Sequence, residues 1–90
     1  MKNKIKNIHF VGIGGSGMSG IAEVMHNLGF SVTGSDSGKS VIIDHLIDVG
    51  INIYPGHSEK NTMGVDVLVV SSAIKDTNPE IKSAKNKKIP

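Results

Sequence analysis

The apolar positions of this 90-residue chain form two alternating kinds of run. Short, nearly continuous apolar stretches have the composition of buried strands, and they cover residues 8–13, 30–35, 51–54 and 65–70. Between the first three stretches, apolar residues recur at helical spacing over 18–28 and 41–49, and a glycine follows each run. A last helix is predicted to begin at Asn78-Pro79-Glu80, because asparagine caps helices well and proline fits their first turn.

Continuous apolar strands that alternate with helices predict an α/β fold, with a parallel sheet covered on both faces. Right-handed crossovers and the usual Rossmann-like, doubly wound arrangement give the strand order 3-2-1-4. Ile89 and Pro90 are expected to start a fifth strand that is truncated, so residues 1–90 would be one domain of a longer protein. Ligands bind such sheets where the strand order reverses, which lies here between the first and fourth strands.

Composition narrows the class of protein. A content of 38% hydrophobic and 20% charged residues fits one small soluble domain, and the chain has no apolar window or signal-like segment that suggests a membrane, so we expect a cytoplasmic protein. The net charge of +2 and the low aromatic content of 3% argue against a nucleic-acid partner. Without cysteine, and with four histidines at no ligand-like spacing, we expect no metal site.

The strongest chemical motif is a glycine-rich loop after the first predicted strand. Gly12, Gly14 and Gly17 fit G-x-G-x-x-G, and Gly15 and Ser16 complete the loop at the start of a helix. Gly12 would permit the tight turn, Gly14 would let a diphosphate approach the backbone, and Gly17 would allow close helix packing. The predicted site is a diphosphate cradle at a helix N-terminus, and a glycine-rich turn without a ligand is the alternative.

Five further residues, in three segments, are expected at the same edge of the sheet. Asp36, 19 residues after Gly17, could accept hydrogen bonds from ribose or a base, or could instead cap a helix. His57 could touch a base or sugar, or be a solvated loop residue. Ser71 and Ser72, with Ala73, end the fourth strand and could donate to phosphate, or could be simple turn residues; neither serine has a histidine and acid partner for catalysis. Without arginine, NADP is the least expected dinucleotide, while NAD and a UDP-sugar both remain open.

The segment GSDSGKS, residues 34–40, resembles a Walker A loop but does not match one. Walker A needs four residues between its glycine and Gly-Lys, and only three separate Gly34 from Gly38. Asp36 would also place a carboxylate in a pocket meant for phosphate. We therefore predict that Lys39 and Ser40 mark the start of the second helix and not an ATP site.

Four ordered motifs carry a resemblance to a known family. They are IHFVGIGGSGMSGIAE at residues 8–23, GSD at 34–36, GINIYPGH at 50–57 and VVSSAIKDTNPEI at 69–81. Together they resemble the N-terminal domain of the Mur ligases of peptidoglycan synthesis, and GIGGSGMS is more similar to the alanine-adding members than to the murein-peptide recycling members. The similarity spans nearly all of the chain.

The resemblance implies a three-domain, ATP-dependent ligase whose first domain holds UDP-N-acetylmuramate. Residues 14–17 would then cradle the diphosphate, Asp36 would meet the uridine, Ser71, Ser72 and Ala73 would line the sugar-diphosphate side, and His57 could join them. ATP, Mg²⁺ and L-alanine would bind to domains outside these 90 residues, so the chain alone would bind nucleotide sugar without catalytic residues of its own. An NAD-binding half-domain of an oxidoreductase and a nucleotide-sensing regulatory domain are the alternatives.

Overall fold

The computed structural model describes residues 5–15, 17–72 and 74–90. Its elements are β1 (Asn7–Val11), α1 (Met18–Asn27), β2 (Ser31–Asp36), α2 (Val41–Asp48), β3 (Asn52–Pro55), the short 3-10 helix η1 (Glu59–Thr62), β4 (Val67–Val70) and α3 (Pro79–Asn86). Each predicted strand and helix is present, with ends that differ by a few residues. The additional element is η1, which the apolar pattern did not predict because its sequence, EKNT, has no apolar residue.

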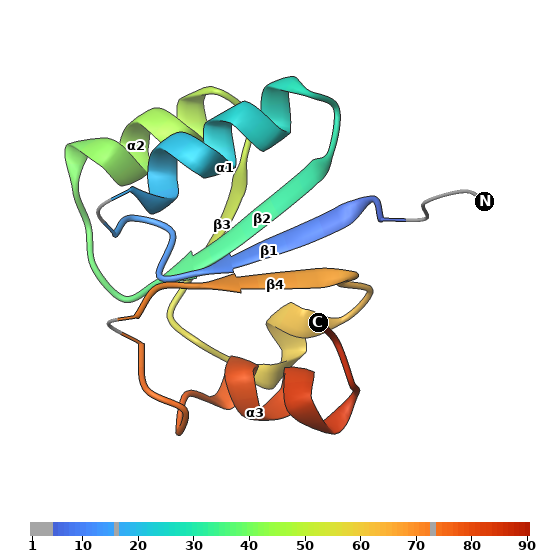
Figure 1. Ribbon diagram of the computed structural model, residues 1–90. Coiled ribbons are helices and arrows are strands. Elements are labelled where there is room, and N and C mark those ends of the chain that lie inside the picture. Colours follow the sequence, from blue (N-terminus) through green and yellow to red (C-terminus); the bar gives the residue numbers. More distant parts are fainter. Residues whose placement is uncertain (1–4, 16, 73) are drawn as a thin grey trace.

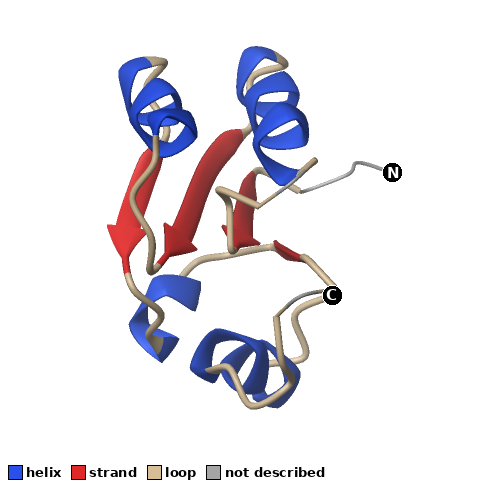
Figure 2. Cartoon of the chain, turned by 90° about the vertical axis from the view of Figure 1, so that its left-hand side faces the viewer, coloured by secondary structure: helices blue, strands red, loops and turns tan. Residues whose placement is uncertain are grey.

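The four strands form one parallel sheet in the order β3-β2-β1-β4, as predicted. Helices α1 and α2 cover one face, and η1 and α3 cover the other (Figures 1 and 2). The carbonyl oxygen of Pro90 accepts a hydrogen bond from the Leu68 amide at 2.9 Å, so the last residue lies beside β4. Ile89 and Pro90 are not themselves in a strand.

The apolar core lies between the sheet and helices α1 and α2. Phe10 of β1, Ala22 of α1 and Leu46 of α2 are completely buried there, and Ile13 of the glycine loop packs with them. Gly34 of β2 leaves room for Ile13, because a Cβ at position 34 would lie only 2.7 Å from the Cβ of Ile13. The core thus holds the start of the glycine loop against the sheet.

Candidate functional site

The glycine loop is fixed to the end of the neighbouring strand. The amides of Gly12 and Ile13 both donate to the carbonyl oxygen of Ser35 in β2, at 2.8 and 3.1 Å. Gly12 and Gly17 have φ angles of +75° and +80°, in the left-handed region that glycine adopts without steric cost. The start of this loop, at Gly12 and Ile13, is therefore held in place before any ligand binds.

Asp36 joins the glycine loop to the loop before α2. Its Oδ2 accepts a hydrogen bond from the Gly14 amide at 2.9 Å, and its Oδ1 accepts one from the Gly38 amide at 2.8 Å. The alternative role of Asp36 as a helix cap does not apply, since the N-cap of α2 is Ser40. A ligand that used the Gly14 amide would have to share it with this carboxylate or displace the carboxylate.

The structure shows why glycine is needed at positions 14, 15 and 17, and the reasons differ in part from those that we predicted. A Cβ at Gly14 would lie 2.8 Å from Cδ1 of Ile43 and 3.0 Å from Oδ2 of Asp36, so this position is needed for packing even without a ligand. We had predicted that Gly17 allows close helix packing, but an added Cβ there would meet nothing within 4 Å. The reason for glycine at this position is its positive φ. A Cβ at Gly15 would lie 3.2 Å from the Gly12 carbonyl oxygen.

Helix α1 differs from the other helices at its N-terminus. The side chains of Ser40, Ser58 and Asn78 accept hydrogen bonds from backbone amides at the starts of α2, η1 and α3. The N-cap of α1 is Gly17, which has no side chain to do this. The Met18 amide donates to the carbonyl oxygen of Gly15 at 3.0 Å, so the start of α1 is held by a backbone bond in place of a side-chain cap. The helix dipole favours negative charge at this end.

The loop after β4 lies against the glycine loop, as the strand order predicted. A Cβ at Gly12 would be 3.0 Å from Cδ1 of Ile74, which shows how closely the two loops approach. Ser71 is half-buried and Ser72 is exposed. Ser16 and Ala73, which we also predicted to be site residues, lie outside the described residues. The structure thus brings the two predicted loops to one edge of the sheet.

His57 follows β3 at this same edge and turns one nitrogen inward. Its Nδ1 lies 2.9 Å from Oγ of Ser35, and Ser35 donates its hydroxyl proton to Oε1 of Glu80 at 2.6 Å. Nδ1 is also 3.7 Å from the other carboxylate oxygen of Glu80. His57 is therefore connected to α3 through a buried polar contact and is not a freely solvated loop residue.

Glu80, in the first turn of α3, is the centre of a buried polar network beneath the sheet. Besides Ser35, its carboxylate meets Nε2 of His9 at 2.9 Å, the Ser58 amide at 2.9 Å and Nδ2 of Asn61 at 2.6 Å. His9, Ser35 and Glu80 are all completely buried. Burial by itself raises the pKa of Glu80, but the hydrogen bonds from these four partners outweigh it and lower the pKa to about 2. The carboxylate is thus ionised at neutral pH.

Sequence reasoning missed this network. His9 was counted only among scattered histidines, and Glu80 only as part of a helix start. The available signal was alternation: His9 stands between Ile8 and Phe10 in β1, and it pairs in register with Thr33, whose hydroxyl lies 2.7 Å from Nδ1 of His9. Polar residues at alternate positions of β2, Thr33 and Ser35, with His9 beside them in β1, would have indicated that one face of the sheet is polar.

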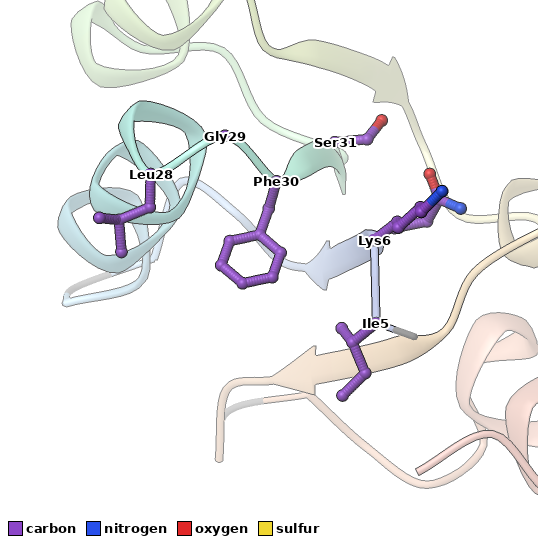
Figure 3. Close-up of a pocket in the computed structure, with 7 residues that line it drawn as sticks. Ile5, Lys6, Leu28, Gly29, Phe30 and Ser31 are labelled. Carbon is purple, nitrogen blue, oxygen red and sulfur yellow. The ribbon is translucent and has the colours of Figure 1, made fainter. Parts of the chain in front are cut away.

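Not every cavity lies at the edge of the sheet where the glycine loop and the loop after β4 meet. One of about 400 Å³ lies at the amino ends of β1 and β2, lined by residues that include Ile5, Leu28 and Phe30 (Figure 3). Another, of about 420 Å³, borders the predicted site and is lined by Asp36, Gly38, Lys39, Asp44 and apolar residues of α2 and β3. Only the second adjoins a residue that the motifs had singled out.

The Gly-Lys-Ser segment is the start of a helix. The hydroxyl of Ser40 accepts a hydrogen bond from the Ile43 amide at 3.1 Å, so the Gly-Lys-Ser segment begins α2, as predicted. Among the described residues there is no cluster of three histidine, aspartate or glutamate side chains that could hold a metal ion. Nor does that part of the chain contain a helix long and apolar enough to cross a membrane.

Comparison with known sequences gives one consistent result. A sequence model described as "Mur ligase family, catalytic domain" matches residues 7–90. The UDP-N-acetylmuramate–L-alanine ligase of Neisseria gonorrhoeae is 56% identical over 90 residues, and that of Janthinobacterium sp. is 53% identical. In both comparisons the match covers 100% of this chain and 19% of the relative, so the chain spans about one fifth of the length of these relatives.

Solved structures agree with the sequences. The UDP-N-acetylmuramate–alanine ligase of Thermotoga maritima is similar with a TM-score of 0.89 and 38% identity, over 93% of this chain and 20% of that one. A murein peptide ligase of Psychrobacter arcticus is similar with a TM-score of 0.86 and 28% identity, over 93% of this chain and 18% of that one. Both similarities extend over almost the whole sheet and its helices.

Proposed function

Because this chain belongs to the Mur ligase family, we propose that it forms the N-terminal, nucleotide-sugar-binding domain of an ATP-dependent ligase that joins L-alanine to UDP-N-acetylmuramate in peptidoglycan synthesis. The observation that carries the proposal is 56% identity, over the whole chain, to ligases named for that reaction. Such identity favours the ligase over an NAD-binding half-domain or a nucleotide-sensing regulatory domain, the two alternatives that the glycine loop alone left open.

The geometry of the site supports binding of the diphosphate at the start of α1. Gly17 leaves the first turn of that helix without a side-chain cap, and the loop after β4 approaches the glycine loop from the other side. Gly14, Gly15, Ser16 and Gly17 would surround the diphosphate, and Ser71, Ser72 and Ala73 would face it. Asp36, beside the cavity of about 420 Å³, would meet the uridine.

The remaining substrates are assigned to other parts of the protein. We assign ATP, Mg²⁺ and L-alanine to segments outside this chain, because the chain spans only about one fifth of the length of the ligases that it resembles. The 90 residues would then supply binding and orientation of the nucleotide sugar and no catalytic residue. Because the proposed reaction consumes ATP, which cells keep inside, the proposed place of action is the cytoplasm.

Isothermal titration of the chain with UDP-N-acetylmuramate and with NAD tests the proposal. We expect measurable binding of the UDP-sugar and much weaker binding of NAD, because both present a diphosphate and only the rest of each ligand distinguishes them. Equal or tighter binding of NAD would reverse the assignment in favour of the oxidoreductase.

A substitution tests whether binding occurs at the predicted site. Asp36→Asn removes the charge of the carboxylate that we propose meets the uridine, so one charge-assisted hydrogen bond is lost and we expect UDP-N-acetylmuramate to bind roughly tenfold to a hundredfold more weakly. Asp48→Asn, an equal change at the exposed end of α2, is the matched control and should leave affinity unchanged. Equal affinity in both variants would place the ligand elsewhere.

A further inference from the structure

The segment from Gly56 to Ser58, between β3 and η1, is held at both of its ends by backbone hydrogen bonds. It contains no apolar side chain, and its three residues are half-buried. The Gly56 amide donates to the carbonyl oxygen of Asp36 at 2.9 Å, and the Ser58 amide donates to Oε2 of Glu80 at 2.9 Å. Because hydrogen bonds are directional, the position of this segment depends on a small number of donors and acceptors.

Asn61, in η1, connects this segment to the buried carboxylate of Glu80. An ionised carboxylate can only accept, so the amide nitrogen of Asn61, Nδ2, is the atom that faces Oε2 of Glu80, at 2.6 Å. The same nitrogen donates its second hydrogen to the carbonyl oxygen of Gly56 at 3.3 Å. The backbone amide of Asn61 also donates to the carbonyl oxygen of Ser58 at 3.0 Å. One residue thus bonds the segment at both ends and joins it to Glu80.

The segment that Asn61 holds lies at the edge of the sheet where we propose that the ligand binds. It follows the carboxyl end of β3, and its Gly56 amide is bonded to Asp36, whose side chain meets the glycine loop. The side-chain amide of Asn61, in contrast, is directed at Gly56 and Glu80, within the protein. Asn61 is therefore placed to shape this side of the site without touching a ligand in it.

We propose that Asn61 is a positioning residue for the nucleotide-sugar site: it bonds the Gly56 carbonyl and the Glu80 carboxylate at once, and so holds residues 56–58 in their binding geometry before the ligand arrives. A segment that is ordered in advance loses little conformational entropy when the ligand binds, so this preorganisation raises affinity. The inference rests on the proposed function and adds to it a residue that lies outside all four of the sequence motifs.

Backbone dynamics of the wild-type chain test the preorganisation without a mutation. Nitrogen-15 relaxation of residues 56–58 should give order parameters of about 0.85, the value of a rigid backbone, in the free chain. Saturation with UDP-N-acetylmuramate should leave these order parameters unchanged. Order parameters below about 0.6 in the free chain would show that the ligand, and not Asn61, orders the segment.

Asn61→Ala removes both side-chain bonds and leaves the other three donors to Glu80 in place. Isothermal titration should show that UDP-N-acetylmuramate binds roughly tenfold more weakly to this variant. The order parameters of residues 56–58 should fall in the free variant and return to about 0.85 when the ligand saturates it. Asn86→Ala, at the exposed end of α3, is the matched control and should change neither the affinity nor the order parameters.

A second substitution separates hydrogen bonding from packing. Leucine has nearly the size of asparagine but no donor, so Asn61→Leu should bind the UDP-sugar at least as weakly as Asn61→Ala. A residue that only added global stability would lower the free energy of unfolding, which urea denaturation measures. It would leave the affinity of the folded chain and the order parameters of residues 56–58 as they are in the wild type.

The two proposals fail in distinguishable ways. The inference is wrong, and the proposed function stands, if the wild-type chain binds the UDP-sugar but residues 56–58 are disordered in the free chain. The same holds if Asn61→Ala or Asn61→Leu folds and binds with the affinity of the wild type. If the wild-type chain does not bind the UDP-sugar at all, the proposed function is wrong, and this inference with it.

Discussion

The two faces of the sheet are stabilised by different physics. On the α1 and α2 side, apolar residues such as Ile8, Phe10 and Leu46 pack into one cluster. On the α3 side, alternate residues of β2 (Thr33 and Ser35) are polar, and His9 of β1 and Ser35 meet the carboxylate of Glu80. The same strands β1 and β2 therefore present an apolar core to one pair of helices and a buried hydrogen-bond network to the other.

The two faces therefore have different roles: one mainly supplies stability, and the other specifies the positions of neighbouring elements. Hydrophobic packing is non-directional and tolerates swaps that conserve volume, so the apolar face mainly supplies stability. A buried network works only when all of its donors and acceptors are paired, so the polar face specifies one position for α3 and for the loop that carries His57. The face with directional bonds is also the one connected, through His57, to the edge of the sheet where we propose that the ligand binds.

Removing the centre of the polar face should have the largest effect. Glu80→Ala leaves His9, Ser35, the Ser58 amide and Asn61 without their acceptor, so we expect the chain to lose about 3–5 kcal/mol of unfolding free energy. Urea denaturation followed by circular dichroism measures the loss. Glu59→Ala, at an exposed position of η1, is the control and should change stability by less than about 0.5 kcal/mol. Equal stability of the two variants would mean that the network does not hold α3.

Acid should weaken the same face without a mutation. The pKa of Glu80 falls from 4.5 to about 2 on folding, so its contribution is fully present above pH 4.5 and is lost as pH falls through 2. That shift corresponds to about 3 kcal/mol. Urea midpoints measured from pH 6 to pH 2 should fall less steeply in Glu80→Gln than in the wild type. Parallel curves would contradict a carboxylate stabilised by the fold.

On the apolar face, adding a methyl group at Gly34 tests how tightly the core is packed. Gly34→Ala places a Cβ 2.7 Å from the Cβ of Ile13, which a side-chain rotation cannot relieve, so we expect a loss of about 1–3 kcal/mol. The matched control is Gly20→Ala in α1, where an added Cβ meets nothing within 4 Å and better helix propensity should raise stability by up to about 1 kcal/mol. Thermal unfolding of both variants compares the two signs. A stabilising Gly34→Ala would show that this face is loosely packed.

The smallest effect is expected at the Gly-Lys-Ser segment, at the edge of the apolar face. Ser40→Ala removes the cap that accepts from Ile43, so stability should fall by about 1 kcal/mol. Urea denaturation measures this loss.

Lys39→Ala, in the same segment, should leave stability unchanged and UDP-sugar affinity within about threefold, since an exposed lysine offers at most a screened contact. Urea denaturation measures the stability and isothermal titration measures the affinity. Magnesium-dependent ATP hydrolysis that Lys39→Ala abolished would show that this segment is a phosphate site after all.

The sequence by itself determined the local elements and their order. Apolar runs ending at glycines, helical periodicity and the Asn78-Pro79 start were enough for β1 to β4, α1 to α3 and the strand order 3-2-1-4. The glycine loop and its family resemblance could also be read directly, because a backbone motif is continuous in the chain. Ser40 as the start of α2 followed from counting spacer residues.

Only the tertiary structure decided which distant side chains meet. His9 and Glu80 are 71 positions apart, and no local pattern connects them until a parallel sheet brings β1, β2 and the start of α3 together. The same holds for Gly34, whose need for glycine comes from Ile13 on another segment, and for Asp36, which turned out to join two loops and not to cap a helix. Helix and strand propensities depend on neighbours along the chain, which the sequence states directly. Burial and hydrogen-bond pairing depend on neighbours in space, which only the folded structure shows.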